Sequence, residues 1–234
     1  MSVDPIADKV TERYRERRTQ GKPGWSDEES YQEKEACLKR IIEKFAIGEK
    51  AHFLELGCGA GNLTLYAAKK GLEAYGVDCC CEAIEWAKEK AKSEGVKTDF
   101  KMGNVVDLKG YRDCSFDIVF DGDCLHRILG SDRARCLASV FRVLRSGGIF
   151  HARARLVNDE FNEPVKANQE IYFDPQARLL VWNGVPYDFL SCEDEFLEEL
   201  RNAGFEIMDS EKKPDIDNKS LFYKGVFLVN AIRP

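Results

Sequence analysis

Three glycines and one aspartate have the spacing best suited to chemistry in this chain. The stretch FLELGCGAGN places Gly57, Gly59 and Gly61 directly after an apolar run and before a helix-forming segment. Glycines there allow a tight turn, and the unpaired N–H groups of the following helix face the same spot. Asp78 follows Gly57 by 21 residues, a spacing at which a carboxylate can accept hydrogen bonds from ribose hydroxyls. The pattern predicts a nucleotide loop; a tight turn that holds no ligand is the alternative.

Two further residues of the loop refine this interpretation. Asn62 stands where a dinucleotide-binding fingerprint has its third glycine, which weighs against a nicotinamide-dependent oxidoreductase. Cys58 lies inside the turn, where a small side chain is required. A reactive thiol at the helix N-terminus is the alternative for Cys58.

His126 and Asp123 are the candidates for acid–base work. Both follow a continuous apolar run at 116–120, which is expected to be a buried strand, and ligands of such folds bind beyond the carboxyl ends of the strands. The ordinary pKa of histidine lies near neutrality, so His126 can act as a base or orient a substrate. A histidine packed at a strand–helix junction and a solvated loop acid are the alternatives.

Composition narrows the class of protein. The 234 residues have a formal net charge of −6, which argues against general binding to a phosphate backbone, although a local basic patch remains open. The chain has no run of 18 apolar residues, and its first residues contain no apolar signal region. Nine cysteines without C-x-x-C spacing indicate reduced thiols in the cytoplasm and no zinc or other metal site.

Strands alternating with helices must position these residues. We expect strands at 51–56, 72–77, 96–102, 116–120 and 149–156, and helices at 31–45, 62–70, 81–94 and about 131–144. Such alternation is typical of right-handed βαβ units and a parallel sheet with helices on both faces. Two more strands, at 205–209 and 221–232, follow a helix that opens near Ser191 and closes at Gly204, and they are expected to be antiparallel neighbours.

Two segments lie outside this alternation. Residues about 157–190 are rich in β-formers, and Asn183-Gly184 is a strong hairpin signal, so we expect an inserted β-hairpin. Residues 1–45 are expected to form an N-terminal helical cap or lid, and residues 46–234 the main domain. The predicted fold is α/β and Rossmann-like, with a seven-stranded, mostly parallel sheet whose last strand is antiparallel.

Several motifs in order give the chain a resemblance to the class I S-adenosylmethionine-dependent methyltransferases. ELGCGAGN resembles the glycine-rich first motif, and GVD at 76–78 the second. MGNVVDL at 102–108 is similar to the adenine-contacting loop, SFDIVFDGDCLHRIL at 115–129 to the fourth-strand motif, and FRVLRSGGIF at 141–150 to the turn before the fifth strand. The resemblance covers roughly residues 50–156.

The resemblance implies a set of cofactor contacts. Glu55 and the loop 57–61 would meet the methionine portion, and Asp78 the ribose. The adenine would meet Gly103, Asn104 and Val105, with Cys79 along the adenine or ribose edge. Asp121 and Gly122 would lie near the methionine amino group or the methyl. Asn104 stands where the family often has Asp, and the acids of Asp121-Gly122-Asp123 replace the commoner small or amide residues.

The N-terminal segment is the expected lid. Tyr14 and Trp25 flank a cationic run and could cover the sulfonium, with cation–π attraction as part of the physics. Arg18 of that run would pair with the cofactor carboxylate. A solvated helix face with a stray aromatic anchor is the alternative.

The sequence therefore predicts an enzyme that transfers a methyl group from S-adenosylmethionine to an oxygen or nitrogen of a small molecule by in-line displacement, releasing S-adenosylhomocysteine. No membrane partner is expected, a nucleic-acid partner is not favoured, and the oligomeric state is a monomer or homodimer. A non-catalytic module that binds the same cofactor, and a protein or RNA methyltransferase, remain the alternatives.

Overall fold

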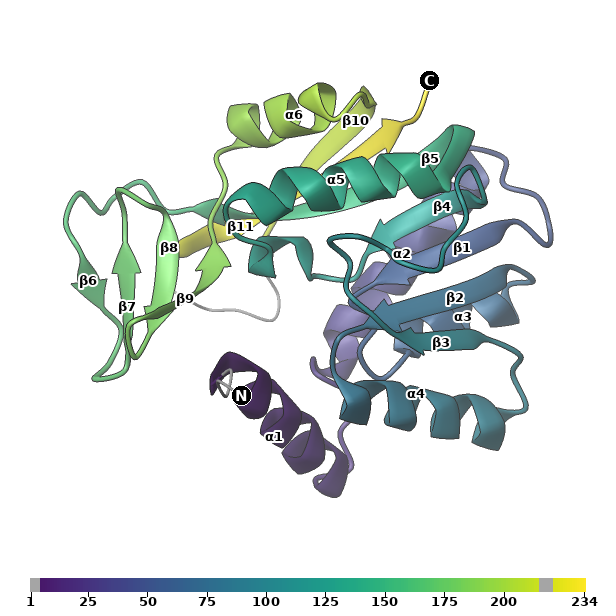
Figure 1. The fold of residues 1–234 in the computed structure, drawn as a ribbon, viewed down its shortest axis with the longest axis horizontal. Helices are drawn as coiled ribbons and strands as arrows, with labels where there is room; N and C mark the ends of the chain where they lie inside the picture. The colour runs from purple at the N-terminus through teal and green to yellow at the C-terminus, as the bar shows by residue number, and fades with distance from the viewer. Residues whose placement is uncertain (1–4, 215–220) are drawn as a thin grey trace.

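The computed structural model describes residues 5–214 and 221–234, and it places them in two β-sheets with six α-helices (Figure 1). The helices are α1 (Pro5–Thr19), α2 (Glu28–Lys44), α3 (Asn62–Lys69), α4 (Cys81–Glu94), α5 (Ser131–Val143) and α6 (Glu193–Asn202). The larger sheet contains β1 (His52–Leu56), β2 (Glu73–Asp78), β3 (Asp99–Met102), β4 (Phe116–Asp121), β5 (Leu144–Val157), β10 (Glu206–Lys213) and β11 (Tyr223–Ile232). The smaller sheet contains β6 (Val165–Lys166), β7 (Ile171–Asp174), β8 (Leu179–Trp182) and β9 (Val185–Phe189).

The larger sheet has the strand order β10-β11-β5-β4-β1-β2-β3. Neighbouring strands from β3 across to β5 are parallel, whereas β11 is antiparallel to both β5 and β10. The Rossmann-like, mostly parallel sheet predicted from the sequence is confirmed, including its antiparallel last strand. The strand order reverses between β1 and β4, and this reversal is where such sheets bind ligands.

Helices cover both faces of this sheet (Figure 1). On one face, Leu137 of α5 and Phe196 of α6 are buried against side chains such as Phe150 of β5. On the other face, Leu38 of α2 packs in a cluster with Phe53 of β1. Because α2 shares this core, α1 and its connection to α2 are, among the described residues of the predicted cap at 1–45, the ones that stay candidates for a lid.

The inserted segment differs in size from its prediction. Asn183 and Gly184 connect β8 to β9 with φ of 46° and 82°, as the hairpin signal indicated. The insertion contains two more strands, β7 and the two-residue β6, so it is a small four-stranded sheet (Figure 1). Strand β5 begins at Leu144, not at the predicted 149, and its register with β4 shifts between Phe116 and Ile118.

Candidate functional site

The glycine loop lies at the carboxyl end of β1, beside the reversal in strand order. Gly57, Gly59 and Gly61 have φ of 65°, 52° and 77°, which are left-handed values that favour glycine. The loop is tied to the next strand, because the N–H of Cys58 donates to the carbonyl of Val77 at 3.0 Å. The thiol of Cys58 is buried in a cluster with Phe100, so only its backbone is left to meet a ligand.

Asp78 ends β2 directly beside this loop. One carboxylate oxygen accepts a hydrogen bond from the N–H of Gly59 and the other from the N–H of Cys80, both at 2.9 Å. Burial raises the pKa of Asp78 above its ordinary value, and these backbone donors oppose that shift. Each carboxylate oxygen has a second lone pair, so Asp78 can still accept hydrogen bonds from a diol.

Glu55 lies beneath the loop on β1. Its Oε2 accepts hydrogen bonds from the N–H of Thr64 at 2.9 Å and from the hydroxyl of Thr64 at 2.5 Å. Burial raises the pKa of Glu55 to about 8, so the unliganded side chain is mostly protonated at neutral pH. Gly122 approaches closely here: a Cβ on it would lie 2.9 Å from Glu55 Oε1 and 2.7 Å from the carbonyl oxygen of Leu56.

Asp121, expected near the methionine portion, has one carboxylate oxygen already engaged by the backbone of its own loop. Asp121 is fully buried, and its Oδ1 accepts hydrogen bonds from the N–H groups of Cys124 and Leu125 at 2.8 and 3.1 Å. The carboxylate thus caps the short 3₁₀ turn η1 (Leu125–Arg127) because that turn leaves its first N–H groups without carbonyl partners. Asp121 shapes the loop after β4 and is not placed to meet a ligand through this oxygen.

Asp123 is neither a solvated acid nor a free carboxylate facing a substrate. Its oxygens lie 2.7 Å from Lys34 Nζ and 2.6 Å from Arg153 Nε, and both cations are about 95% buried. Burial opposes the charge, but Arg153 and Lys34 hold the pKa of Asp123 well below its ordinary value. A carboxylate with so low a pKa is a poor general base. We therefore treat Asp123 as the residue that positions Lys34 and Arg153.

His126 lies in η1, and only 4% of its surface is exposed. Its Nε2 is 3.7 Å from Oδ1 of Asp188, a fully buried residue of the inserted strand β9. Burial lowers the pKa of His126 well below its ordinary value, and Arg155 and Arg127 add to this effect. The ring is therefore neutral at neutral pH and can accept a hydrogen bond, but so low a pKa makes it a weak base, as for Asp123.

Asp188 joins the inserted sheet to the larger one. Its carboxylate lies 2.9 Å from Arg127 Nε and 3.1 Å from Arg155 Nη1, and the hydroxyl of Tyr223 donates to it at 3.2 Å. These partners come from η1, β5 and β11. The insertion is thus held at the same edge of the sheet as His126.

Helix α1 packs directly on the glycine loop. Tyr14 is 94% buried, and a Cβ on Gly59 would lie 2.6 Å from its hydroxyl oxygen. The ring centroids of Tyr14 and Trp25 are 5.3 Å apart. Both aromatic residues of the predicted lid therefore lie together, and Tyr14 covers the loop.

The structure does not bring Arg18 to this site. Arg18 pairs with Glu89 of α4, and both side chains are about half exposed. Its neighbour Arg17 donates to the carbonyl of Gly24 at 2.8 Å and so fixes the connection between α1 and α2. Asn62 supports the same connection, because its Nδ2 donates to the carbonyl of Pro23 at 3.1 Å. Arg18 is removed from the candidate site because it lies on the outer surface of α1.

The predicted adenine segment follows β3. The N–H of Gly103 donates to the carbonyl of Asp78 at 2.9 Å, and Oδ1 of Asn104 accepts from the N–H of Val106 at 2.9 Å. Val105 is buried, whereas Asn104 and Cys79 are exposed. These residues therefore follow the carboxyl ends of β2 and β3, at the same edge of the sheet as Asp78, and their contact with adenine stays a prediction.

Lys34 is a site residue that sequence reasoning missed. It is 96% buried on α2, and its Nζ lies 5.5 Å from the ring centroid of Tyr31, whose hydroxyl accepts a hydrogen bond from the N–H of Ser26 at 3.3 Å. The signal was present: Lys34 precedes Leu38 and Ile41 by four and seven residues, so it occupies a buried position of the apolar stripe. A lysine on that stripe requires a buried anionic partner, which is Asp123.

Among the described residues, the helices are too short or too polar for any of them to cross a membrane. A family model described as a methyltransferase domain matches residues 54–152. The S-adenosyl-L-methionine-dependent Diels-Alderase iccD of Talaromyces variabilis is 29% identical over 77% of this chain and 62% of its own length. The putative methyltransferase YqeM of Bacillus subtilis (strain 168) is 26% identical over 77% of this chain and 85% of its own.

Solved structures give the same picture of the fold. The 1,6-didemethyltoxoflavin-N1-methyltransferase of Burkholderia thailandensis, solved with S-adenosylhomocysteine, has a TM-score of 0.70 at 23% identity, over 97% of this chain and 87% of its own. An S-adenosylmethionine-dependent methyltransferase of Clostridium acetobutylicum ATCC 824 has a TM-score of 0.66 at 19% identity, over 86% and 91%. At these identities the likeness concerns the fold alone.

Proposed function

The chain belongs to the class I S-adenosylmethionine-dependent methyltransferases, and from that premise we propose that it methylates an oxygen or nitrogen of a small molecule by in-line displacement. S-adenosylmethionine is the cofactor and S-adenosylhomocysteine the product. The part that we propose is the acceptor, a small molecule, and the type of atom that is methylated, an oxygen or a nitrogen.

The residues at the edge of the sheet fit this cofactor. Asp78 offers acceptors for the ribose hydroxyls, and the left-handed turn at Gly57–Gly61 lets the backbone approach closely. We assign the methionine carboxylate to Lys34 in place of Arg18, because Lys34 is a buried cation beside Tyr31. Val105 and Cys79 would flank the adenine, and Tyr14 with Trp25 would cover the cofactor from α1.

One contact supports a small acceptor over a macromolecule. Lys9 of α1 lies with its Nζ 4.0 Å above the ring centre of Trp182 and 4.0 Å from Oε2 of Glu170, so α1 touches the inserted sheet. Trp182 also donates to Glu170 at 2.9 Å. A protein or RNA chain would have to separate these elements to reach the glycine loop from this side, whereas a small molecule would not.

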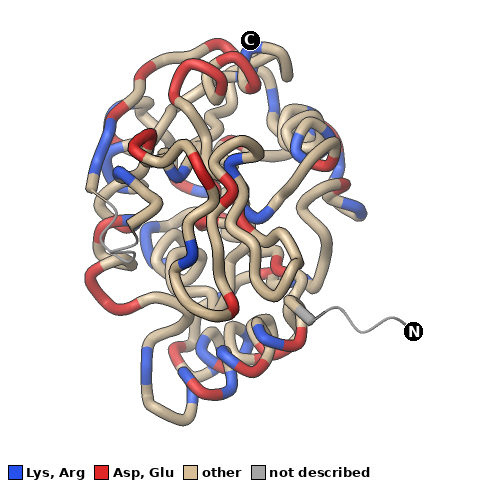
Figure 2. Tube along the Cα trace, turned by 90° about the vertical axis from the view of Figure 1, so that its left-hand side faces the viewer, with Lys and Arg blue, Asp and Glu red and all other residues tan. Residues whose placement is uncertain are grey.

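The basic run of α1 gives no support to an RNA acceptor. Arg15 and Arg18 are paired with Glu82 and Glu89 of α4. Basic and acidic residues alternate along the helices at the lower end of the molecule (Figure 2). Because these cations are paired with carboxylates, their contribution to the electrostatic term that dominates nucleic-acid binding is weak.

The chain's own residues then position the acceptor and exclude water. When bound, the cofactor supplies an activated methyl group, whose bond to sulfur breaks as the acceptor attacks. Alignment of acceptor and methyl can contribute ~7–11 kcal/mol. Where the acceptor carries a proton, we propose that His126 orients it, since the neutral ring can accept a hydrogen bond. Its lowered pKa makes it a weak base, and its Nε2 lies 3.7 Å from Asp188, beyond hydrogen-bond length. Asp123 keeps Lys34 and Arg153 in place.

An acceptor screen tests the proposal. The purified chain is incubated with methyl-labelled donor and a panel of hydroxylated and amino-bearing small molecules, and S-adenosylhomocysteine and labelled product are measured. We expect at least one acceptor to gain the label, and the gain to disappear with Asp78→Ala. Cofactor binding without release of S-adenosylhomocysteine would favour a non-catalytic module, and label in protein or RNA would contradict a small acceptor.

A cyclisation activity is the second candidate, because the Talaromyces relative is a Diels-Alderase. Such a reaction rearranges its substrate and consumes no methyl donor. Product of unchanged mass with no S-adenosylhomocysteine released would identify it in the same screen.

A further inference from the structure

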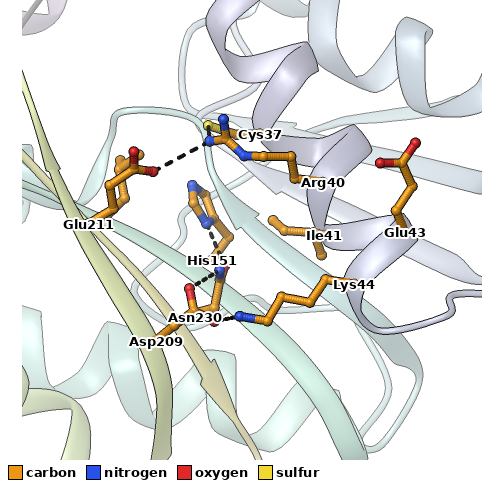
Figure 3. A pocket seen from close by; sticks show the side chains of 10 residues that line it. Cys37, Arg40, Ile41, Glu43, Lys44, His151, Asp209, Glu211 and Asn230 are labelled. Carbon is orange, nitrogen blue, oxygen red and sulfur yellow. Dashed lines mark hydrogen bonds and ion pairs between the residues drawn. The ribbon is translucent and has the colours of Figure 1, made fainter.

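A pocket outside the proposed cofactor site lies between α2 and the strands β10 and β11, with a volume of about 500 Å³ (Figure 3). Arg40 and Lys44 line it from α2, and Asp209 and Glu211 from β10. His151 of β5 also lines it and is 97% buried. The proposed function uses none of these side chains.

Hydrogen bonds fix the tautomer of His151. The Nδ2 of Asn230 donates to Asp209 at 2.7 Å, so the Oδ1 of Asn230 is the atom 2.8 Å from Nδ1 of His151. An amide oxygen only accepts hydrogen bonds, and Nδ1 must therefore carry the proton. Burial lowers the pKa of His151 to about 4, so the ring is neutral and Nε2 is an acceptor. This buried Nε2 has no hydrogen-bond partner among the described residues, and Figure 3 shows it on the side of the ring toward Glu211 and Cys37.

The two cations of the pocket already have partners. Lys44 Nζ already lies 2.7 Å from Asp209, and Arg40 donates to the sulfur of Cys37 at 3.1 Å. Glu211 is 3.6 Å from the nearest nitrogens of Arg40 and Lys213, which is beyond hydrogen-bond length. The lining holds two cations and three carboxylates. These are Arg40, Lys44, Glu43, Asp209 and Glu211.

From this geometry we propose that the pocket binds a small molecule bearing a primary ammonium group. Its N–H donors match the neutral acceptor Nε2 of His151 and the carboxylate of Glu211, whose nearest cations lie 3.6 Å away. An anionic group would face Glu211 and the lone pair of Nε2, whereas the cations Arg40 and Lys44 are already engaged by other groups of the pocket. The occupant is therefore an amine, and its binding is independent of methyl transfer.

Nuclear magnetic resonance of the full chain tests the proposal directly. The chain has three histidines, so ¹⁵N labelling of histidine gives three ring systems, and His151→Gln assigns one of them. Ethylammonium chloride is the probe, and tetramethylammonium chloride is the control because it has the same charge but no N–H donor. We expect a spectrum with the proton on Nδ1 of His151, and a saturable shift of its Nε2 resonance with ethylammonium only.

Two matched variants locate the site. Glu211→Gln should weaken ethylammonium binding about threefold, as expected for a partly exposed charged partner. Glu206→Gln removes the same charge from the same strand at a position that does not line the pocket, and should leave binding unchanged. A proton on Nε2, an equal shift with tetramethylammonium, an equal effect of both variants, or no saturable shift would each overturn the proposal.

Discussion

The carboxylate of Asp78 joins the glycine loop to the start of α4. It accepts one hydrogen bond from Gly59 in the loop and one from Cys80, the residue that precedes α4. A side chain with two backbone partners is held in one rotamer, so its remaining lone pairs have a fixed direction before any ligand arrives. Asp78 therefore both shapes the turn and offers a prepared contact.

Replacing Asp78 by alanine should weaken the binding of S-adenosylhomocysteine by ~1–3 kcal/mol, because a charged hydrogen-bond acceptor is lost from a buried position. Isothermal titration calorimetry measures this. Asp99→Ala is the control, since Asp99 on the neighbouring β3 makes only a half-exposed pair with Lys101 at 3.0 Å. Similar losses in both variants would contradict the assignment of Asp78.

Individual residues also show which contacts could be predicted from the sequence and which could not. Asp78 could be found because its distance from the glycine loop is set by one βαβ unit, which is local in the chain. The burial of Lys34 could be read from the apolar stripe, but its partner could not be assigned, and neither could that of Asp188. Each is paired with a residue far away in the sequence, Asp123 in one case and Arg155 in the other. The misplaced Arg18 has the same cause: whether it or Arg17 faces inward depends on how α1 docks.

At the scale of elements, the ends of β1 and β4 meet at Gly122. The N–H of Gly122 donates to the carbonyl of Leu56 at 2.8 Å, and there is no room for a side chain. Gly122→Ala should lower the free energy of unfolding by about 1–3 kcal/mol, because overpacking against backbone forces the strands to shift. Urea denaturation measures it. Gly48→Ala, with nothing within 4 Å of its Cβ, should be neutral, and equal losses would refute the steric argument.

The connection between α1 and α2 depends on Arg17. Besides Gly24, it donates to the carbonyl of Ser26 at 2.6 Å and pairs with Asp27 at 2.9 Å. Arg17→Gln should raise backbone hydrogen exchange over residues 20–27 and weaken S-adenosylhomocysteine binding by about 1 kcal/mol, because the lid is no longer held. Arg18→Gln makes the same charge change on the outer surface and should do neither. A larger effect at Arg18 would restore the prediction made from the sequence.

Elements whose signals are local were predicted well. Helix α4 ends at Gly95 in a left-handed conformation, and the hairpin turn at Asn183 and Gly184 forms as expected. The two-residue strand β6 and the early start of β5 were not predicted, because both are defined by pairing with distant strands rather than by their own residues.

At the scale of the whole molecule, buried titratable groups make stability depend on pH. Glu55 has a folded pKa of about 8 against an ordinary value of 4.5, because burial disfavours its charge. Between these values the folded state binds more protons than the unfolded state, so stability falls as the pH rises. The pKa of His151 is lowered by burial to about 4, so it acts in the opposite direction, but only below its ordinary value of 6.5.

Between pH 6.5 and 8, Glu55 therefore contributes more to the pH dependence of the free energy of unfolding than the buried histidines do. The free energy of unfolding should fall by roughly 2 kcal/mol across this window, since one fully coupled group contributes about 1.4 kcal/mol per pH unit. Urea denaturation at several pH values measures the slope. Glu55→Gln keeps an acceptor for Thr64 but cannot ionise, so its slope should be flat, whereas the exposed Glu206→Gln should retain the slope of the unmodified chain. If the slope persists in Glu55→Gln, another group is responsible and Glu55 is already ionised in the folded state.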